Sequence, residues 1–214
     1  DLYNIAISGL SDQEILKAFV GARLPEHIYQ DLGTIILQAR HPLAVRSSSK
    51  LEDSYYQPFA GIYNTYMIPI VPVKSLAIRM LETAIKCVYA SVFFRSSKAY
   101  ALATSNLIDE EKMGIIIQEV CGRQYNDRFY PALSGVARSI NFYPISPEKV
   151  SDGIATIGFG LGKLIAEGGG GLRFSPKYPH KIMQLSTPES AVKSTQKYFY
   201  ALNMNPDRFV PSTD

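Results

Sequence analysis

The spacing of apolar residues predicts two helices near the start of the chain. Ser11 with Glu14 three positions later forms a capping-box pattern, and apolar residues follow it at helical spacing. Pro25 stands where a second helix would begin, and Pro42 lies just after its expected end. We therefore expect residues 11–40 to form a helical hairpin that packs against the rest of the chain.

Apolar runs in the next segment predict a sheet with one long helix. The run "PLAVRSSS" indicates a buried strand that leads into a polar loop, and "GIYNTYMIPIV" indicates a second strand. The run "MGIIIQEV" predicts a strand buried on both faces. We expect residues 43–47 and 114–120 to lie in one mixed sheet. A single helix over 74–101, with an i,i+4 pair of Glu82 and Lys86, would cover it. Its contacts would be Leu76, Met80, Leu81, Ile85 and Val88.

The second half of the chain has weaker signals. The segments "ALSGVARSINFYP" and "GIATIGFG" predict further strands with glycine at their ends. The run "EGGGG" predicts a flexible loop, and a helix is expected from Pro188 to about Leu202. Strands mixed with helices predict an α/β (α+β) domain.

Composition excludes several classes of protein. Of 214 residues, 46% are hydrophobic and 19% charged, an ordinary balance for a folded domain. The net charge of +3 is too small to indicate a nucleic-acid-binding surface. No apolar run approaches the ~20 residues that span a bilayer.

Cys87 and Cys121 both sit among apolar residues, so we expect buried thiols and a reducing, cytoplasmic location. Because the chain starts at Asp1 and not at Met, we expect a piece of a longer protein.

Several motifs of catalytic and cofactor sites fail on inspection. The segment "GFGLGK" has neither the first glycine nor the Ser/Thr of a P-loop, and it also lacks the third glycine of a dinucleotide fingerprint. A strand that ends in a loop of small residues is the simpler interpretation. The three histidines are scattered, so no metal site is expected, and no G-x-S-x-G nucleophile motif occurs.

The segment "VRSSSKLEDSYYQPFAGIYNT" is the strongest candidate site. Arg46 stands at the end of an expected buried strand, and its rigid fork of donors matches phosphate oxygens. The serines that follow offer neutral donors, and Gly61 lets the backbone approach a ligand closely. The alternative is a solvated loop in which Glu52 and Asp53 pair with Arg46.

The order of motifs resembles that of a known family. The segments "AVRSSSKLEDS", "FAGIYNTY", "AIKCVYASVFFRSSKAY", "MGIIIQEV", "SGVA" and "IGFGLGKLIAEGG" are similar to the N-terminal ATP-binding domain of phosphoenolpyruvate synthases and pyruvate phosphate dikinases. Rifampin phosphotransferases share that domain. The resemblance covers roughly residues 40–172, and the V-R-S-S…E-D…F-A-G…T series is its most specific part.

The resemblance implies a fold, an activity and a set of site residues. The fold would be ATP-grasp-like, with two lobes around ATP, and its division would be 1–42 helical lead-in, 43–178 nucleotide-binding domain and 179–214 helical tail. With Mg²⁺, phosphate would pass from ATP to a histidine on another domain of the same chain and then to an acceptor. Arg46 would contact the phosphates, Gly61 and Thr65 would lie in the loop that covers them, and Gln118 with the backbone of Glu119 and Val120 would lie at the adenine.

The sequence also departs from the family pattern. No glycine-lysine segment precedes Arg46, and neither the D-x-E strand nor the L-Q-x-R-P segment follows. Lys163 stands where the family usually has Glu. We therefore expect no catalytic residue and no metal ligand in this segment. The alternative function is a non-catalytic nucleotide-binding or interaction module that retains the fold. ATP and the other domains of a longer chain are the expected partners, with no nucleic acid and no membrane.

Overall fold

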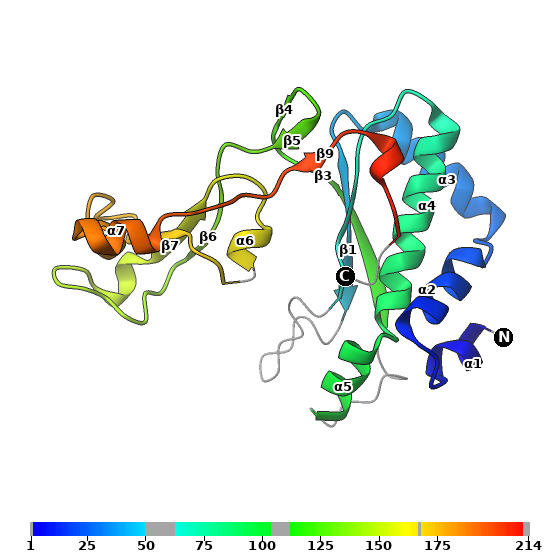
Figure 1. Cartoon of the computed structure of the whole chain (residues 1–214), viewed down its shortest axis with the longest axis horizontal. Coiled ribbons are helices and arrows are strands. Elements are labelled where there is room, and N and C mark those ends of the chain that lie inside the picture. Colours follow the sequence, from blue (N-terminus) through cyan, green and yellow to red (C-terminus); the bar gives the residue numbers. More distant parts are fainter. Residues whose placement is uncertain (1, 50–62, 104–111, 167, 212–214) are drawn as a thin grey trace. The chain divides into compact units, whose positions relative to one another are not determined.

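The computed structural model describes residues 2–49, 63–103, 112–166 and 168–211 (Figure 1). The chain divides into two compact units. Unit 1 comprises residues 1–120 and 203–214, and unit 2 comprises residues 121–202. The expected division at 42/43 and 178/179 stays a prediction, since compactness does not test which segments fold independently.

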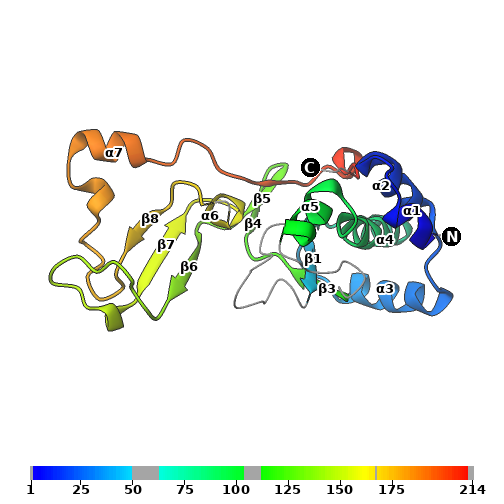
Figure 2. The same cartoon turned by 90° about the horizontal axis from the view of Figure 1, so that it is seen from below.

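Unit 1 consists of helices packed on a small antiparallel sheet. The helices are α1 (Leu2–Ile7), α2 (Asp12–Gly21), α3 (Glu26–Gln38), α4 (Lys74–Ser91) and α5 (Arg95–Ala103), with a 3₁₀ turn η4 (Pro206–Arg208) near the end of the chain. The strands β1 (Leu43–Ser49), β2 (Tyr66–Ile68) and β3 (Met113–Glu119) are arranged in the order β2-β1-β3. Helix α4 contacts all three strands, and α2 and α3 pack on α4 (Figures 1 and 2).

The core of unit 1 lies between α4 and the sheet and continues to the first helices. Met80, Leu81, Ile85 and Val88 of α4 are buried, and Leu76 packs against them, which confirms the predicted helix face. Ile15, Leu16 and Phe19 of α2 belong to the same core. The predicted helical hairpin is confirmed. The Ser11 side chain accepts from the Glu14 backbone N–H, and Glu14 in turn accepts from the Ser11 N–H at 2.9 Å.

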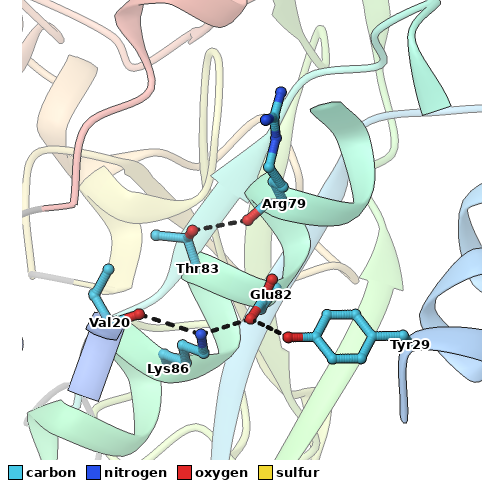
Figure 3. Close-up of polar contacts among 6 residues, drawn as sticks. All are labelled: Val20, Tyr29, Arg79, Glu82, Thr83 and Lys86. Atoms are coloured by element: carbon cyan, nitrogen blue, oxygen red, sulfur yellow. Dashed lines mark hydrogen bonds and ion pairs between the residues drawn. The ribbon is translucent and has the colours of Figure 1, made fainter. Parts of the chain in front are cut away.

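A partly buried polar network joins three of these helices (Figure 3). Lys86 Nζ on α4 donates to Glu82 Oε1 at 2.6 Å and to the backbone oxygen of Val20 at the end of α2 at 3.2 Å. Tyr29 of α3 donates its hydroxyl to the same Glu82 oxygen at 2.7 Å. Burial raises the pKa of Glu82, but the hydrogen bonds from Lys86 and Tyr29 outweigh this effect, so the pKa lies below its usual value. The predicted Glu82–Lys86 pair is confirmed.

The single helix predicted over 74–101 is wrong. The helix stops at Ser91, and α5 starts at Arg95. The backbone oxygen of Ser91 accepts the hydroxyl of Ser97 at 2.7 Å, and the N–H of Arg95 donates to the Asp12 carboxylate at 2.8 Å. The Ser91 oxygen and the Arg95 N–H therefore have hydrogen-bond partners without a continuous helix. The Asp12 carboxylate, from a distant segment, caps the start of α5.

The strand predictions were right in position and partly wrong in detail. Strands 43–47 and 114–120 do share a sheet, but β1 pairs antiparallel with both β2 and β3, so the sheet is not mixed among the described strands. The strand β2 is short because Pro69 follows it and has no N–H for a ladder. Among the described residues, β3 is packed against other elements on one face, and Ile116 on its other face is 44% exposed. A continuous apolar run therefore did not indicate burial on both faces.

Unit 2 is built from short strands. The strands β6 (Ser134–Arg138), β7 (Ile154–Gly158) and β8 (Leu172–Phe174) form an antiparallel sheet, and the first two confirm the strands predicted there. A second sheet has the order β4-β5-β9, from β4 (Arg123–Tyr125), β5 (Arg128–Tyr130) and β9 (Leu202–Asn203). The boundary between the units falls within β9, after Leu202. The helical pieces are η2 (Val150–Asp152), α6 (Lys163–Ala166), η3 (Met183–Leu185) and α7 (Pro188–Ser194).

Three smaller predictions about the second half are corrected. The helix starting at Pro188 ends at Ser194 and not near Leu202, because the next residues are held against the end of β7 by the side chain of Gln196. Gly171 is closely packed, since a Cβ there would lie 2.8 Å from the backbone oxygen of Ile157, so this part of "EGGGG" is not a loose loop. Cys121 is exposed, whereas Cys87 is buried as expected.

Candidate functional site

The face of the unit 1 sheet opposite α4 carries the candidate site. Alternation along the strands sends Val45 and Ile117 toward α4 and sends Arg46, Ile116 and Gln118 to the other face. We call this other face the far face. Its residues from β1, β2 and β3 are Ala44, Arg46, Ser48, Met67, Gly114, Ile116 and Gln118.

Arg46 lies in the middle of the far face. It follows the fully buried Val45, so a packed strand fixes its backbone while its side chain is exposed. Its Nη1 donates to Oε1 of Gln118 at 3.4 Å, a long and weak hydrogen bond between diagonal neighbours on β1 and β3. Ile116 is directly opposite Arg46 in the ladder. The alternative partners Glu52 and Asp53 lie outside the described residues.

Thr65 precedes the strand that pairs with β1 on the side opposite to β3. It is exposed and immediately precedes β2, whose register pairs Val45 with Tyr66. Continuing that register by one residue places Thr65 opposite Arg46. Arg46 and Gln118 belong to one sheet, and Thr65 comes just before its strand β2. Gly61 lies outside the described residues.

Glu119 and Val120 are tied to the turn that enters β1. The Glu119 carboxylate accepts the backbone N–H groups of Arg40 and His41, the second at 3.2 Å. These two hydrogen bonds lower the pKa of Glu119, so its side chain stays ionised at neutral pH. The N–H of Val120 donates to the backbone oxygen of Pro42 at 2.8 Å. Neither the Glu119 side chain nor the Val120 N–H is directed to the far face.

This arrangement suits a ligand that is both apolar and anionic. The exposed side chain of Ile116 and the half-buried Met67 offer apolar surface, and the Arg46 guanidinium offers up to two parallel donors for an anion. Sequence reasoning missed Ile116, because a run of three isoleucines does not tell which of them faces outward. It also missed the Arg46–Gln118 contact, which depends on strand register.

The glycine-rich segment "GFGLGK" forms a tightly held loop in unit 2. Gln196 accepts the N–H of Phe159 at 2.8 Å and donates to the oxygens of Phe159 and Tyr198 at 2.9 Å each. Gly160 has φ +84°, and a Cβ there would lie 2.8 Å from the Tyr200 backbone oxygen, so only glycine fits without strain. Lys163 Nζ lies 5.2 Å from the centre of the Tyr200 ring. The loop is thus a strand end packed by the residues that follow α7.

The described residues contain no group of three or more His, Cys, Asp or Glu that could bind a metal ion. Within the same residues, no helix combines the length and the apolar character needed to span a bilayer.

Comparison with known proteins identifies a family. No curated protein matches the chain at a significant level. The family model described as "Pyruvate phosphate dikinase, AMP/ATP-binding domain" matches residues 8–206, which include the helical hairpin, the far face and all of unit 2. Because this match covers nearly the whole chain, the chain belongs to the family of pyruvate phosphate dikinase AMP/ATP-binding domains, as the order of its motifs predicted.

Proposed function

We propose that this chain is the ATP-binding part of a phosphotransferase of the phosphoenolpyruvate synthase and pyruvate phosphate dikinase type. In the full-length protein, phosphate would pass from ATP to a histidine on another domain and from there to an acceptor. The observation that carries the proposal is the exposed Arg46, held on a rigid strand beside Ile116 and Gln118, in a chain of an ATP-binding family.

In this proposal Arg46 contacts the nucleotide phosphates. Its hydrogen bond to Gln118 is long and exposed, so exchanging it for a phosphate oxygen costs little. A charge-assisted fork to phosphate contributes about 1.5–3 kcal/mol to binding. Because packing of β1 already fixes the backbone, less entropy is lost when the side chain is ordered. Thr65, beside Arg46 in the continued register, and Gly61 would belong to the phosphate-covering loop.

Gln118 and the backbone of Glu119 and Val120 are proposed to lie at the adenine. In an antiparallel ladder the main-chain groups of successive residues point to alternate sides. The N–H of Val120 points toward β1, where Pro42 accepts it, so the N–H and C=O of Glu119 point to the outer edge of β3. An outward N–H and C=O pair can hydrogen-bond the edge of a purine. The flat base would then lie near Ile116.

An ATP-grasp-like fold and Mg²⁺ remain parts of the proposal. Mg²⁺ usually retains water and binds through one or two carboxylates plus substrate phosphates. The described residues supply no carboxylate cluster for it, so we assign none of them to the metal. The metal would neutralise phosphate charge when the nucleotide is bound.

A second candidate function is a nucleotide-binding module without catalysis. Lys163 occupies the position where the family usually has Glu, and it lies against the Tyr200 ring. A residue of opposite charge, held by a neighbouring aromatic ring, favours this alternative.

The test uses the full-length protein with Mg²⁺ and ATP carrying the radioactive label in each phosphate in turn. Acid-labile, alkali-stable label on the protein is expected for phosphohistidine and would support the phosphotransferase. ATP binding by calorimetry without any label transfer would support the non-catalytic module. A protein that binds no ATP would overturn both.

A further inference from the structure

The end of β3 is anchored by a carboxylate that sequence reasoning left without a role. Glu119 Oε1 accepts the N–H of Arg40 and, at 3.2 Å, the N–H of His41, while Oε2 lies 3.6 Å from His41 Nδ1. The neighbouring amide of Val120 donates to Pro42 at 2.8 Å. Three hydrogen bonds thus join Glu119 and Val120, the last two residues before unit 2, to the turn between α3 and β1.

The side chain and the main-chain groups of Glu119 point in different directions. Its side chain is committed to the α3–β1 turn, whereas ladder alternation directs its N–H and C=O to the outer edge of β3. Glu119 is the last residue of the ladder with β1, so the side-chain anchor adds to the ladder in holding these outward groups in place. Charge-assisted hydrogen bonds from a carboxylate to backbone N–H groups are about twice as strong as neutral ones, which makes the anchor stiff.

We propose that Glu119 is a positioning residue that sets affinity for the base of the nucleotide. Its carboxylate, by binding the Arg40 and His41 amides, keeps the main chain of β3 where it can hydrogen-bond the purine edge. The Glu119 side chain itself does not touch the ligand. The inference rests on the proposed function, since it assumes that the base lies at the end of β3.

The proposal separates binding of the base from binding of the phosphates. Glu119→Ala removes the anchor and should weaken ATP and adenosine binding about tenfold. This is a typical effect for a residue that does not touch the ligand and only positions the groups that do. It should leave binding of tripolyphosphate unchanged, because that ligand has no base. Glu119→Gln keeps an oxygen that accepts N–H groups and should restore most of the affinity.

The experiment measures binding of ATP, adenosine and tripolyphosphate to the full-length protein by calorimetry, together with melting temperatures. The matched control is Glu14→Ala. Glu14 also accepts a backbone N–H, from Ser11 at 2.9 Å, but at the start of α2 and away from the sheet. It should lower the melting temperature as Glu119→Ala does and leave all three affinities unchanged.

Four outcomes decide the matter. Selective loss of ATP and adenosine affinity in Glu119→Ala, with recovery in Glu119→Gln, supports the proposal. Equal loss for tripolyphosphate, or the same loss in Glu14→Ala, would show a general effect of stability and overturn it. Unchanged affinities in Glu119→Ala would also overturn it. If the unaltered protein binds tripolyphosphate but neither ATP nor adenosine any better, the proposed adenine position itself has failed.

Discussion

At the residue scale, Arg46 combines a buried backbone with an exposed charge. Val45 before it is fully buried, and the guanidinium reaches only one described side chain, Gln118, at 3.4 Å. A residue needed only for stability would have shorter and less exposed contacts. Among the described residues, the guanidinium therefore keeps most of its donors available for a ligand.

We predict that Arg46→Ala in the full-length protein weakens ATP binding roughly ten- to a hundredfold, since it removes one charge-assisted fork. Arg46→Lys should recover only part of this loss, because it retains the charge but not the paired donors. Calorimetry measures the affinities, and thermal melting provides the control. Unchanged affinity together with a clear loss of stability would make Arg46 a loop anchor.

A pH dependence follows from the carboxylates of Glu14 and Glu119. Hydrogen bonds from the side chain and backbone of Ser11 lower the pKa of Glu14, and those from the Arg40 and His41 amides lower that of Glu119. Both pKa values are lower in the folded state than in the unfolded chain. The stabilisation is therefore complete above the unfolded value and is lost as pH falls through the folded values.

We expect the Glu14→Gln, Glu119→Gln double variant to lose less stability than the unaltered protein between pH 6 and pH 3, a window around the usual Glu pKa of about 4.3. Urea unfolding at a series of pH values measures this. Parallel pH profiles for the two proteins would mean that neither carboxylate is stabilised by its N–H partners.

At the element scale, α4 is held by apolar packing and by one buried ion pair. Lys86 and Glu82 side chains are 10% and 15% exposed, and each has a further partner, Val20 or Tyr29, from another helix (Figure 3). The pair therefore links α2 and α3 to α4 in addition to the apolar core. Removing one member leaves the other charge buried without its partner.

We predict that Lys86→Met alone destabilises the protein by about 3 kcal/mol, because Glu82 then remains buried without its cation. The double variant Lys86→Met, Glu82→Leu should be less destabilised than either single variant, since no charge is left unpaired. Urea denaturation of all three gives the coupling free energy. Additive effects of the two substitutions would show that the pair contributes no coupling.

At the scale of the whole molecule, the chain leaves unit 1 after Val120 and returns to it at Asn203. Phe209 in the returning segment packs against the core formed by α4 and β1. Both chain ends thus belong to unit 1, and unit 2 is a continuous insertion into it.

We predict that residues 1–214 produced alone bind ATP weakly and do not hydrolyse it at a useful rate. The glycine-lysine segment and the D-x-E strand, to which the family resemblance assigns phosphate and metal contacts, are not found in this sequence. Calorimetry and a phosphate-release assay measure both properties. Submicromolar affinity would show that those segments are dispensable.

The sequence by itself determined the local elements and the family. The capping box at Ser11, the apolar face of α4 and the strand before Arg46 depend on residues close together in the chain, and periodicity and capping reveal such features. The order of motifs identified the family that the comparison confirmed.

Only the tertiary structure decided the features that depend on distant residues. Asp12 accepts the N–H of Arg95 and so divides the predicted long helix, and Gln196 holds Phe159 and so ends α7 early. Ile116 is exposed because α4 covers a single face of the sheet, although its neighbours Ile115 and Ile117 pack in the core. The anchoring of Glu119 by Arg40 and His41 likewise spans 79 and 78 residues. Local sequence patterns do not predict such contacts, because the two partners are far apart in the chain and come together only when the helices and strands pack.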